Sequence, residues 1–161
     1  MSEWQPQVLV FLCQWALKSD SEWAQRMEVP PGVHVVEVPC SGRLNPFLLV
    51  SALQQGVDGF LVVGCEPGHC HYKEGNYVAR RKFATLKSFL EHLGLEEGRV
   101  QVVWLSQTES GKFPGLVESL VNDVRQLGPL GALAERVAIL PLQCLEAPFE
   151  GGDSRPSTLQ S

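Results

Sequence analysis

Four apolar runs of strand length restrict the fold of this chain more than any other feature. Two of them, Val8–Cys13 and Gly59–Gly64, contain no polar side chain except the closing thiol. Such continuous runs are typical of strands buried on both faces, as in parallel sheets, because strands with one solvated face alternate in polarity. The other two runs are rich in β-branched residues, which favour strands, and cover Val33–Val38 and Val100–Leu105.

Segments with helical character separate the runs. Asn45 and Pro46 are suited to a helix cap and first turn, and this helix closes at Gly56. A second helix is predicted from a cap at Asn76 to Leu93, with apolar residues at helical spacing. A last helix carries Leu116, Leu120, Val124 and Leu127 and ends at Gly128. We also expect a short or irregular helix over residues 15–27 and a loop over residues 106–111.

This alternation of strands and helices predicts an α/β fold: an open parallel four-stranded sheet with helices on both faces. The 161 residues suffice for one ordinary domain. We expect that domain to cover residues 1–129. Residues 130–161 are then an extension, and its Gly/Ser/Pro-rich tail from about residue 150 is expected to be disordered or to bind a partner.

Charge and hydropathy exclude several functions. With 13 basic and 18 acidic residues the formal net charge is −5, which argues against nucleic-acid binding. No run of about 20 apolar residues could span a membrane. The amino terminus lacks a basic, cleavable signal. We therefore expect a cytoplasmic protein, in which grouped thiols more often bind metal or act in catalysis than form disulfides.

The cysteines are predicted to gather at one edge of the sheet. Cys13 closes the first run, Cys40 follows the second, Cys65 follows the third, and Cys70 lies in the loop after it. Parallel strands end on the same side of a sheet, with neighbours about 4.8 Å apart. Ligands of such sheets bind beyond these carboxyl ends. Cys144 lies outside this pattern and is expected to pack or to face a partner.

Four converging thiolates suit zinc, a 2Fe–2S cluster or a 4Fe–4S cluster. Four grouped thiols favour a metal site over other uses. Their spacing matches neither paired zinc knuckles nor the bacterial ferredoxin run, so it does not name the metal. Two other functions stay open. One is a structural zinc module for protein interaction. The other is a thiol-based oxidoreductase or transferase with Cys65 or Cys70 as its nucleophile.

Three motifs resemble a known family. They are Cys13-Gln-Trp15, then Pro39-Cys40-Ser-Gly42-Arg43-Leu-Asn45-Pro46, and finally Gly64-Cys65-Glu-Pro67-Gly68-His69-Cys70-His71-Tyr72 with Gly75-Asn76-Tyr77. Over about residues 7–129 the chain resembles the iron–sulfur delta subunit of methyl-viologen-reducing hydrogenase. Related subunits occur with heterodisulfide reductase-like, electron-bifurcating complexes.

The resemblance implies a 2Fe–2S cluster and a hetero-oligomer. The protein would carry no catalytic site and would relay electrons from a hydrogenase or other dehydrogenase subunit to a heterodisulfide reductase-like flavin subunit. The expected ligands are the metal-binding residues Cys13, Cys40, Cys65 and Cys70. The family's first motif usually has a second cysteine three residues after the first, where this chain has Ala16. A third alternative is therefore that the fold persists without a cluster.

Three further residues are expected around such a cluster. His69 and His71 flank Cys70, and hydrogen bonding to a sulfur or a loop carbonyl is favoured over ligation of iron by the histidines. Arg43 is expected to offset the negative charge of the cluster or to bind an acidic partner, although an ordinary salt bridge is an equal alternative.

Overall fold

The strands of the computed structural model form one parallel sheet. The structure describes residues 4–17 and 29–131. Within them the strands are β1 (Val8–Cys13), β2 (Val33–Val38), β3 (Gly59–Cys65) and β4 (Val100–Leu105). Their order across the sheet is β2-β1-β3-β4, and every neighbouring pair is parallel. The predicted open four-stranded parallel sheet is confirmed.

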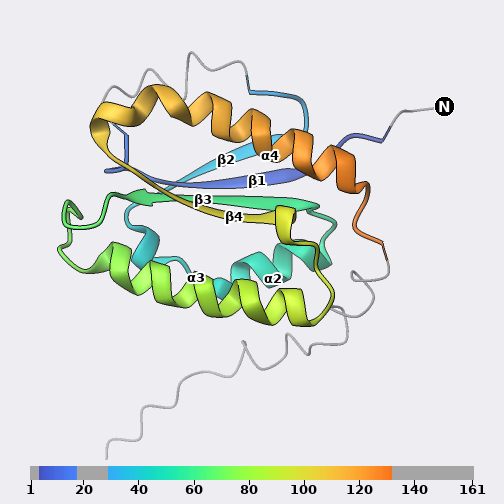
Figure 1. Cartoon of the computed structure of the whole chain (residues 1–161), viewed down its shortest axis with the longest axis horizontal. Helices are drawn as coiled ribbons and strands as arrows, with labels where there is room; N and C mark the ends of the chain where they lie inside the picture. Colours follow the sequence, from blue (N-terminus) through green and yellow to red (C-terminus); the bar gives the residue numbers. More distant parts are fainter. Residues whose placement is uncertain (1–3, 18–28, 132–161) are drawn as a thin grey trace, which may run out of the picture.

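Helices cover both faces of this sheet. Helix α4 (Phe113–Leu127) lies on one face, whereas α2 (Pro46–Gln54) and α3 (Gly75–His92) lie on the other (Figure 1). Short 3-10 turns, η1 (Ser41–Arg43), η2 (Glu97–Arg99) and η3 (Gln107–Lys112), connect the elements. The prediction of helices on both faces is therefore confirmed.

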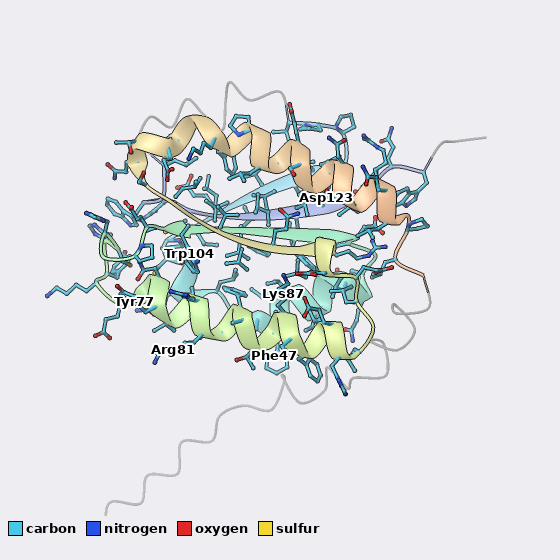
Figure 2. All side chains as sticks on the ribbon, in the orientation of Figure 1. Phe47, Tyr77, Arg81, Lys87, Trp104 and Asp123 are labelled. Carbon is cyan, nitrogen blue, oxygen red and sulfur yellow. The ribbon has the colours of Figure 1, made fainter. Side chains whose placement is uncertain are left out.

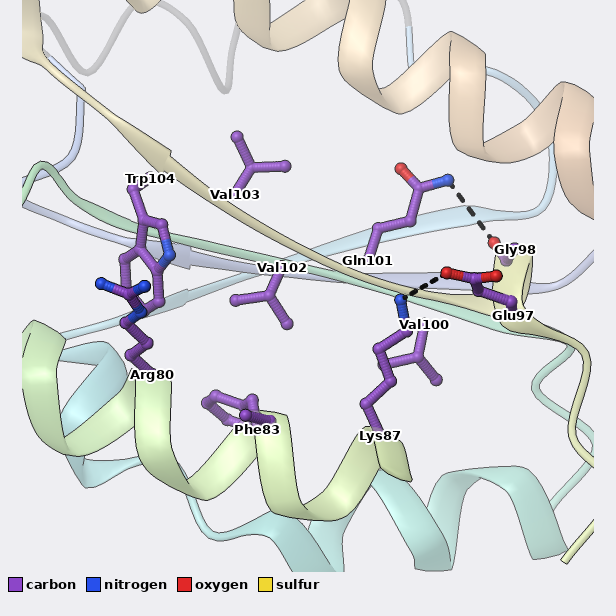
Figure 3. Close-up of a pocket in the computed structure, with 11 residues that line it drawn as sticks. Arg80, Phe83, Lys87, Glu97, Gly98, Val100, Gln101, Val102, Val103 and Trp104 are labelled. Carbon is purple, nitrogen blue, oxygen red and sulfur yellow. Dashed lines mark hydrogen bonds and ion pairs between the residues drawn. The ribbon is translucent and has the colours of Figure 1, made fainter. Parts of the chain in front are cut away.

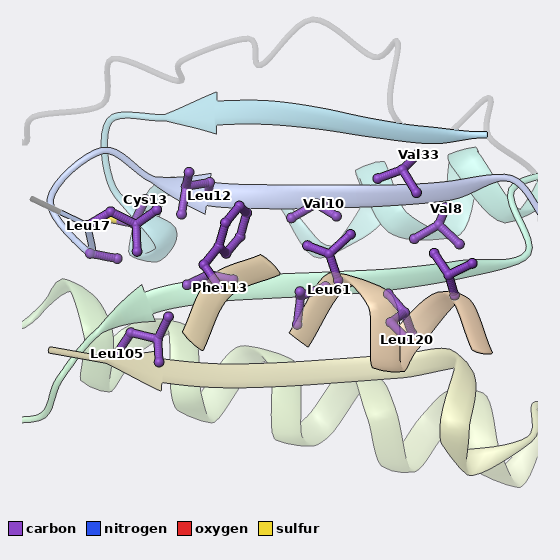
Figure 4. Packing of buried hydrophobic residues seen from close by; sticks show 14 of the residues in the cluster. Val8, Val10, Leu12, Cys13, Leu17, Val33, Leu61, Leu105, Phe113 and Leu120 are labelled. Atoms are coloured by element: carbon purple, nitrogen blue, oxygen red, sulfur yellow. The ribbon is translucent and has the colours of Figure 1, made fainter. Parts of the chain in front are cut away.

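The sheet separates two hydrophobic clusters. Because successive side chains of a strand point to opposite faces, alternate residues of β1 and β3 enter different clusters. Toward α4, Val10 and Leu61 pack with Phe113 and Leu120 (Figure 4). On the opposite face, Phe60 and Val62 pack against the apolar sides of α2 and α3. β3 is buried at all seven positions, as its continuous apolar sequence predicts.

The predicted helix ends are confirmed at two places and wrong at one. The Asn45 side chain accepts a hydrogen bond from the backbone N–H of Phe47 at 3.1 Å, so Asn45 caps α2 as predicted. Gly128 follows α4 with a φ of 79°, a left-handed conformation that glycine adopts without strain. Asn76, however, lies inside α3, whose cap position is Glu74. The buried Asn76 amide is used for another contact, described below.

Two connecting segments also differ from the prediction. The expected loop over residues 106–111 contains η3, whose amino end is capped by a capping box between Ser106 and Glu109. Most of the helix predicted over residues 15–27 lies outside the described residues, and residues 14–16 form a turn. The extension beyond residue 131, with Cys144, also lies outside them.

A buried arginine anchors the amino edge of the sheet. The Arg99 side chain is fully buried and donates to the carbonyl of Asp58 at 3.1 Å and to that of Gly128 at 2.8 Å. Its Nε lies 2.7 Å from Glu96 Oε2. These bonds join the end of α4 to the residue that precedes β3. Among the described helices, none combines the length and the hydropathy required to cross a bilayer.

Candidate metal centre

Cys13, Cys40, Cys65 and Cys70 all lie at the carboxyl edge of the sheet. Cys13 is the last residue of β1 and Cys65 the last residue of β3. Cys40 follows β2 and immediately precedes η1, and Cys70 lies in the loop between β3 and α3. The first three are buried and Cys70 is partly exposed. All four are free thiols.

Cys13 and Cys65 form a close pair. Their sulfurs are 3.6 Å apart, because β1 and β3 are neighbours in register and both end at this edge. Donation from Cys65 lowers the pKa of Cys13 to about 6, although burial opposes this shift. Backbone N–H groups of Trp15, Ser41 and Ala16 also stabilise the Cys13 thiolate. The hydrogen bond to Cys13, together with burial, raises the pKa of Cys65.

Cys40 and Cys70 meet at the first residue of α3. A methyl group on Gly75 would lie 2.4 Å from the Cys40 sulfur and 3.3 Å from the Cys70 sulfur, so both sulfurs face the same bare Cα. Burial raises the pKa of Cys40, and the charges of Cys13 and Cys70 raise it further. Only glycine leaves room for both sulfurs at this position.

The backbone around these thiols is held by specific contacts. The buried Asn76 side chain donates to the carbonyls of Cys65 and Glu66 at 3.2 and 2.9 Å, which fixes the end of β3 against α3. Lys82 of α3 donates to the carbonyl of Gly42 at 2.9 Å. Gly42 itself packs on Gly75, since an added methyl would lie 2.5 Å from the Gly75 carbonyl oxygen. These contacts hold the segment after β2 and the end of β3 in place against α3.

The donor set fits a metal group that takes thiolates in pairs. Two thiolates bound at about 2.3 Å to one tetrahedral ion lie about 3.8 Å apart, close to the separation of the Cys13 and Cys65 sulfurs. Within residues 4–17 and 29–131, no three or more His, Cys, Asp or Glu side chains converge on a point that one ion could occupy. The thiols thus lie as two pairs: Cys13 and Cys65 in direct contact, and Cys40 and Cys70 both against Gly75.

The structure places the other predicted residues around this edge. Arg43 is exposed and lines a hollow of about 440 Å³ beside Cys40. The His69 side chain is 79% exposed, with its Nδ1 3.5 Å from Glu66 Oε2. His71 stacks on Trp15, with ring centroids 3.6 Å apart and an interplanar angle of 5°. Hydrogen bonding of these histidines to a cluster stays a prediction. Sequence reasoning missed the Trp15–His71 stack, which joins motifs far apart in the chain.

Two surface features lie outside the cysteine pairs. A hollow of about 480 Å³ runs between α3 and the edge strand β4, where Val100, Val102 and Trp104 point toward α3 (Figure 3). Lys87 in this hollow contacts Glu97 at 3.4 Å. Tyr77 and Arg81 extend from the side of α3 that faces away from the sheet (Figure 2). Neither feature contains a cysteine; the four cysteines among the described residues all lie at the carboxyl edge.

Known proteins share the sequence of this domain. The family model described as methyl-viologen-reducing hydrogenase, delta subunit, matches residues 8–128, which contain all four cysteines. The chain belongs to this delta-subunit family.

Two hydrogenase proteins are among its relatives. The chain is 43% identical over 129 residues to an iron-sulfur subunit of the F420-non-reducing hydrogenase of Archaeoglobus profundus, a match that covers 79% of this chain and 94% of the relative. It is 35% identical over 128 residues to the vhc iron-sulfur subunit of the F420-non-reducing hydrogenase of Methanococcus voltae, with coverages of 78% and 89%.

A third relative is much longer. It is one of the subunits of the ferredoxin:CoB-CoM heterodisulfide reductase of Methanosarcina mazei, and it is 33% identical over 133 residues, which make up 81% of this chain but 17% of that protein. A delta-subunit-like domain is thus one part of a larger reductase polypeptide in that organism. The resemblance inferred from the three motifs is confirmed.

Proposed function

We propose that this delta-subunit family member is a non-catalytic electron-transfer protein that binds a 2Fe–2S cluster through Cys13, Cys40, Cys65 and Cys70. The observation that carries the proposal is the meeting of these thiols as two pairs. A 2Fe–2S cluster is held by four thiolates, two on each iron. Cys13 and Cys65 would hold one iron, and Cys40 and Cys70 the other.

The electrostatics of the edge support an anionic group. Cys40 and Cys70 face Gly75, where α3 begins, and the amino end of an 18-residue helix carries partial positive charge. Backbone N–H groups already face the Cys13 sulfur. When bound, the cluster would supply one-electron redox chemistry. This chain's residues would hold it, limit its contact with water and leave it near the surface for electron exchange.

A single structural zinc is the second candidate and is less well supported. A structural zinc site needs four ligands arranged tetrahedrally around one ion. The described residues offer no such convergence of three or more ligands, whereas two pairs are what a two-iron group needs. The partly exposed Cys70 keeps the thiol-based oxidoreductase as a further alternative for the experiment to exclude.

The relatives suggest the partners. Two are named as hydrogenase iron-sulfur subunits, and in a third the matching segment forms 17% of a heterodisulfide reductase polypeptide. A domain that is fused to a protein in one organism is a good candidate for a separate partner of that protein in another. We therefore propose a cytoplasmic hetero-oligomer in which this chain relays electrons from a hydrogenase or other dehydrogenase subunit to a heterodisulfide reductase-like flavin subunit.

The test is anaerobic purification of the full chain, followed by iron, sulfide and zinc analysis and by visible and EPR spectra. We expect two irons and two sulfides per chain, and a paramagnetic signal after reduction. Cys65→Ser should lose iron, whereas the matched control Cys144→Ser should retain it. A colourless protein with one zinc per chain would support the zinc module instead. A metal-free protein whose Cys65 or Cys70 is rapidly alkylated would support the thiol-based enzyme.

A further inference from the structure

The indole of Trp15 carries a buried hydrogen-bond donor that is not used. Trp15 Nε1 is shielded from solvent and has no hydrogen-bond partner among residues 4–17 and 29–131. Leaving such a donor unpaired is destabilising, and most buried polar groups in folded proteins are paired. An orphan donor of this kind points to an acceptor that the described part of the polypeptide does not provide.

The position of Trp15 indicates what that acceptor is. Trp15 lines a hollow of about 560 Å³ together with Cys65 and Cys70. Its own backbone N–H faces the sulfur of Cys13, two residues earlier. Three of the four cysteines thus surround the same tryptophan. Glu66, Ser106, Gln107 and Thr108 also line the hollow, and among its lining groups the sulfurs are the ones that would hold a metal. Sulfur bound to a metal carries negative charge that accepts N–H donors.

The ring of Trp15 is held in place by His71. The two rings are parallel within 5° at a centroid distance of 3.6 Å, and His71 also contacts Tyr72 edge-on at 4.9 Å. His71 follows Cys70 directly in the chain, so this stack ties the turn after β1 to the loop after β3. A stacked indole with restricted rotation offers its N–H in a fixed direction.

From these contacts we propose that the Trp15 indole N–H donates a hydrogen bond to a sulfur of the iron–sulfur group and thereby raises its reduction potential. The inference rests on the proposed cluster. Reduction adds one electron, supplied by the partner that acts as electron donor, and increases the negative charge on the sulfurs. A hydrogen-bond donor therefore stabilises the reduced state more than the oxidised state. His71 acts through the tryptophan, as a positioning residue that keeps the indole in its plane.

The experiment compares Trp15→Phe with the wild-type full chain. Phenylalanine keeps an aromatic face for His71 and removes the N–H. We expect iron and sulfide content to be retained and the equilibrium constant for one-electron reduction to fall about tenfold, which corresponds to a potential lower by about 59 mV. Resonance Raman spectra should show an Fe–S band shift between H2O and D2O in the wild type that is smaller in the variant.

The matched control is Trp4→Phe, since Trp4 is 36% exposed and precedes β1 at the opposite edge of the sheet. It should leave potential and Raman shift unchanged. If Trp15→Phe fails to fold, incorporation of benzothienylalanine at position 15 removes the N–H while keeping the size of the ring. Equal potentials and equal D2O shifts in a cluster-bearing Trp15 variant would overturn this inference alone. A wild-type chain without iron would overturn the cluster and the inference together.

Discussion

Replacing Gly75 with alanine is expected to disrupt the second thiol pair. The added methyl would lie 2.4 Å from the Cys40 sulfur and 3.3 Å from the Cys70 sulfur. Favourable contacts between heavy atoms lie near 3.5–4.0 Å, so the Cys40 sulfur would have to move by roughly 1 Å. Overpacking of this kind typically costs about 1–3 kcal/mol. It is opposed by the helix propensity of alanine, about 1 kcal/mol better than glycine.

These two effects give a net loss of about 0–2 kcal/mol in the free energy of unfolding of the metal-free protein. The effect on metal content should be larger, because bound sulfurs cannot move aside to accommodate the methyl. Gly115→Ala is the matched control: Gly115 is also near the start of a helix, and a methyl there meets nothing within 4 Å. That change should leave stability unaltered or raise it by up to about 1 kcal/mol.

The assay has two parts. Urea unfolding under reducing, metal-free conditions gives the free energy of unfolding for both variants and the wild type. Anaerobic reconstitution followed by iron and sulfide analysis gives their cluster content. We expect Gly75→Ala to be less stable than Gly115→Ala and to retain little iron. A Gly75→Ala protein as stable as the control and with full iron content would refute the geometry on which the second pair depends.

Two further predictions concern the opposite edge of the sheet. Arg99→Met should lower the free energy of unfolding in urea by about 3 kcal/mol, because it leaves three carbonyl groups and Glu96 without their buried partner. The matched change at the exposed Arg125, Arg125→Met, should alter it by less than about 0.5 kcal/mol. The Arg99 guanidinium holds the pKa of Glu96 below its usual value. The ionised Glu96 carboxylate thus stabilises the fold at pH values above its pKa in the unfolded chain, about 4.3. This stabilisation is lost as the pH falls through the lower pKa that Glu96 has in the folded protein. Wild-type stability should therefore decrease more steeply with acidification below about pH 5 than that of Glu96→Gln, and parallel curves would contradict this.

The fold could be predicted because its signals are local. Continuous apolar runs predicted β1 and β3, β-branched residues predicted β2 and β4, and the Asn45-Pro46 pair predicted where α2 begins. The cap predicted at Asn76 was wrong because a cap preference describes the asparagine side chain and its neighbouring N–H groups only. In the folded chain the same amide bonds two carbonyls at the end of β3, a tertiary contact that outweighs the local preference.

The arrangement within the candidate site could be predicted only in part. Parallel topology explains why cysteines far apart in sequence reach one edge, but their pairing depends on strand order. Cys13 meets Cys65 because β1 lies beside β3. Cys40 meets Cys70 because a bare Cα at Gly75 admits both sulfurs. Spacing encodes neither fact, and the Trp15–His71 stack likewise needs two loops brought together by the fold.

The same geometry explains how this chain tolerates alanine at the position of the family's additional cysteine. Ala16 is fully buried in the hydrophobic cluster beneath α4, and its backbone N–H bonds the Cys13 carbonyl at 2.9 Å. What residue 16 contributes to Cys13 is therefore a backbone N–H, which alanine supplies as well as cysteine does. Since the remaining four thiols already meet as two pairs, the loss of a thiol at this position does not remove a member of either pair. The departure at Ala16 is thus compatible with a four-thiolate cluster.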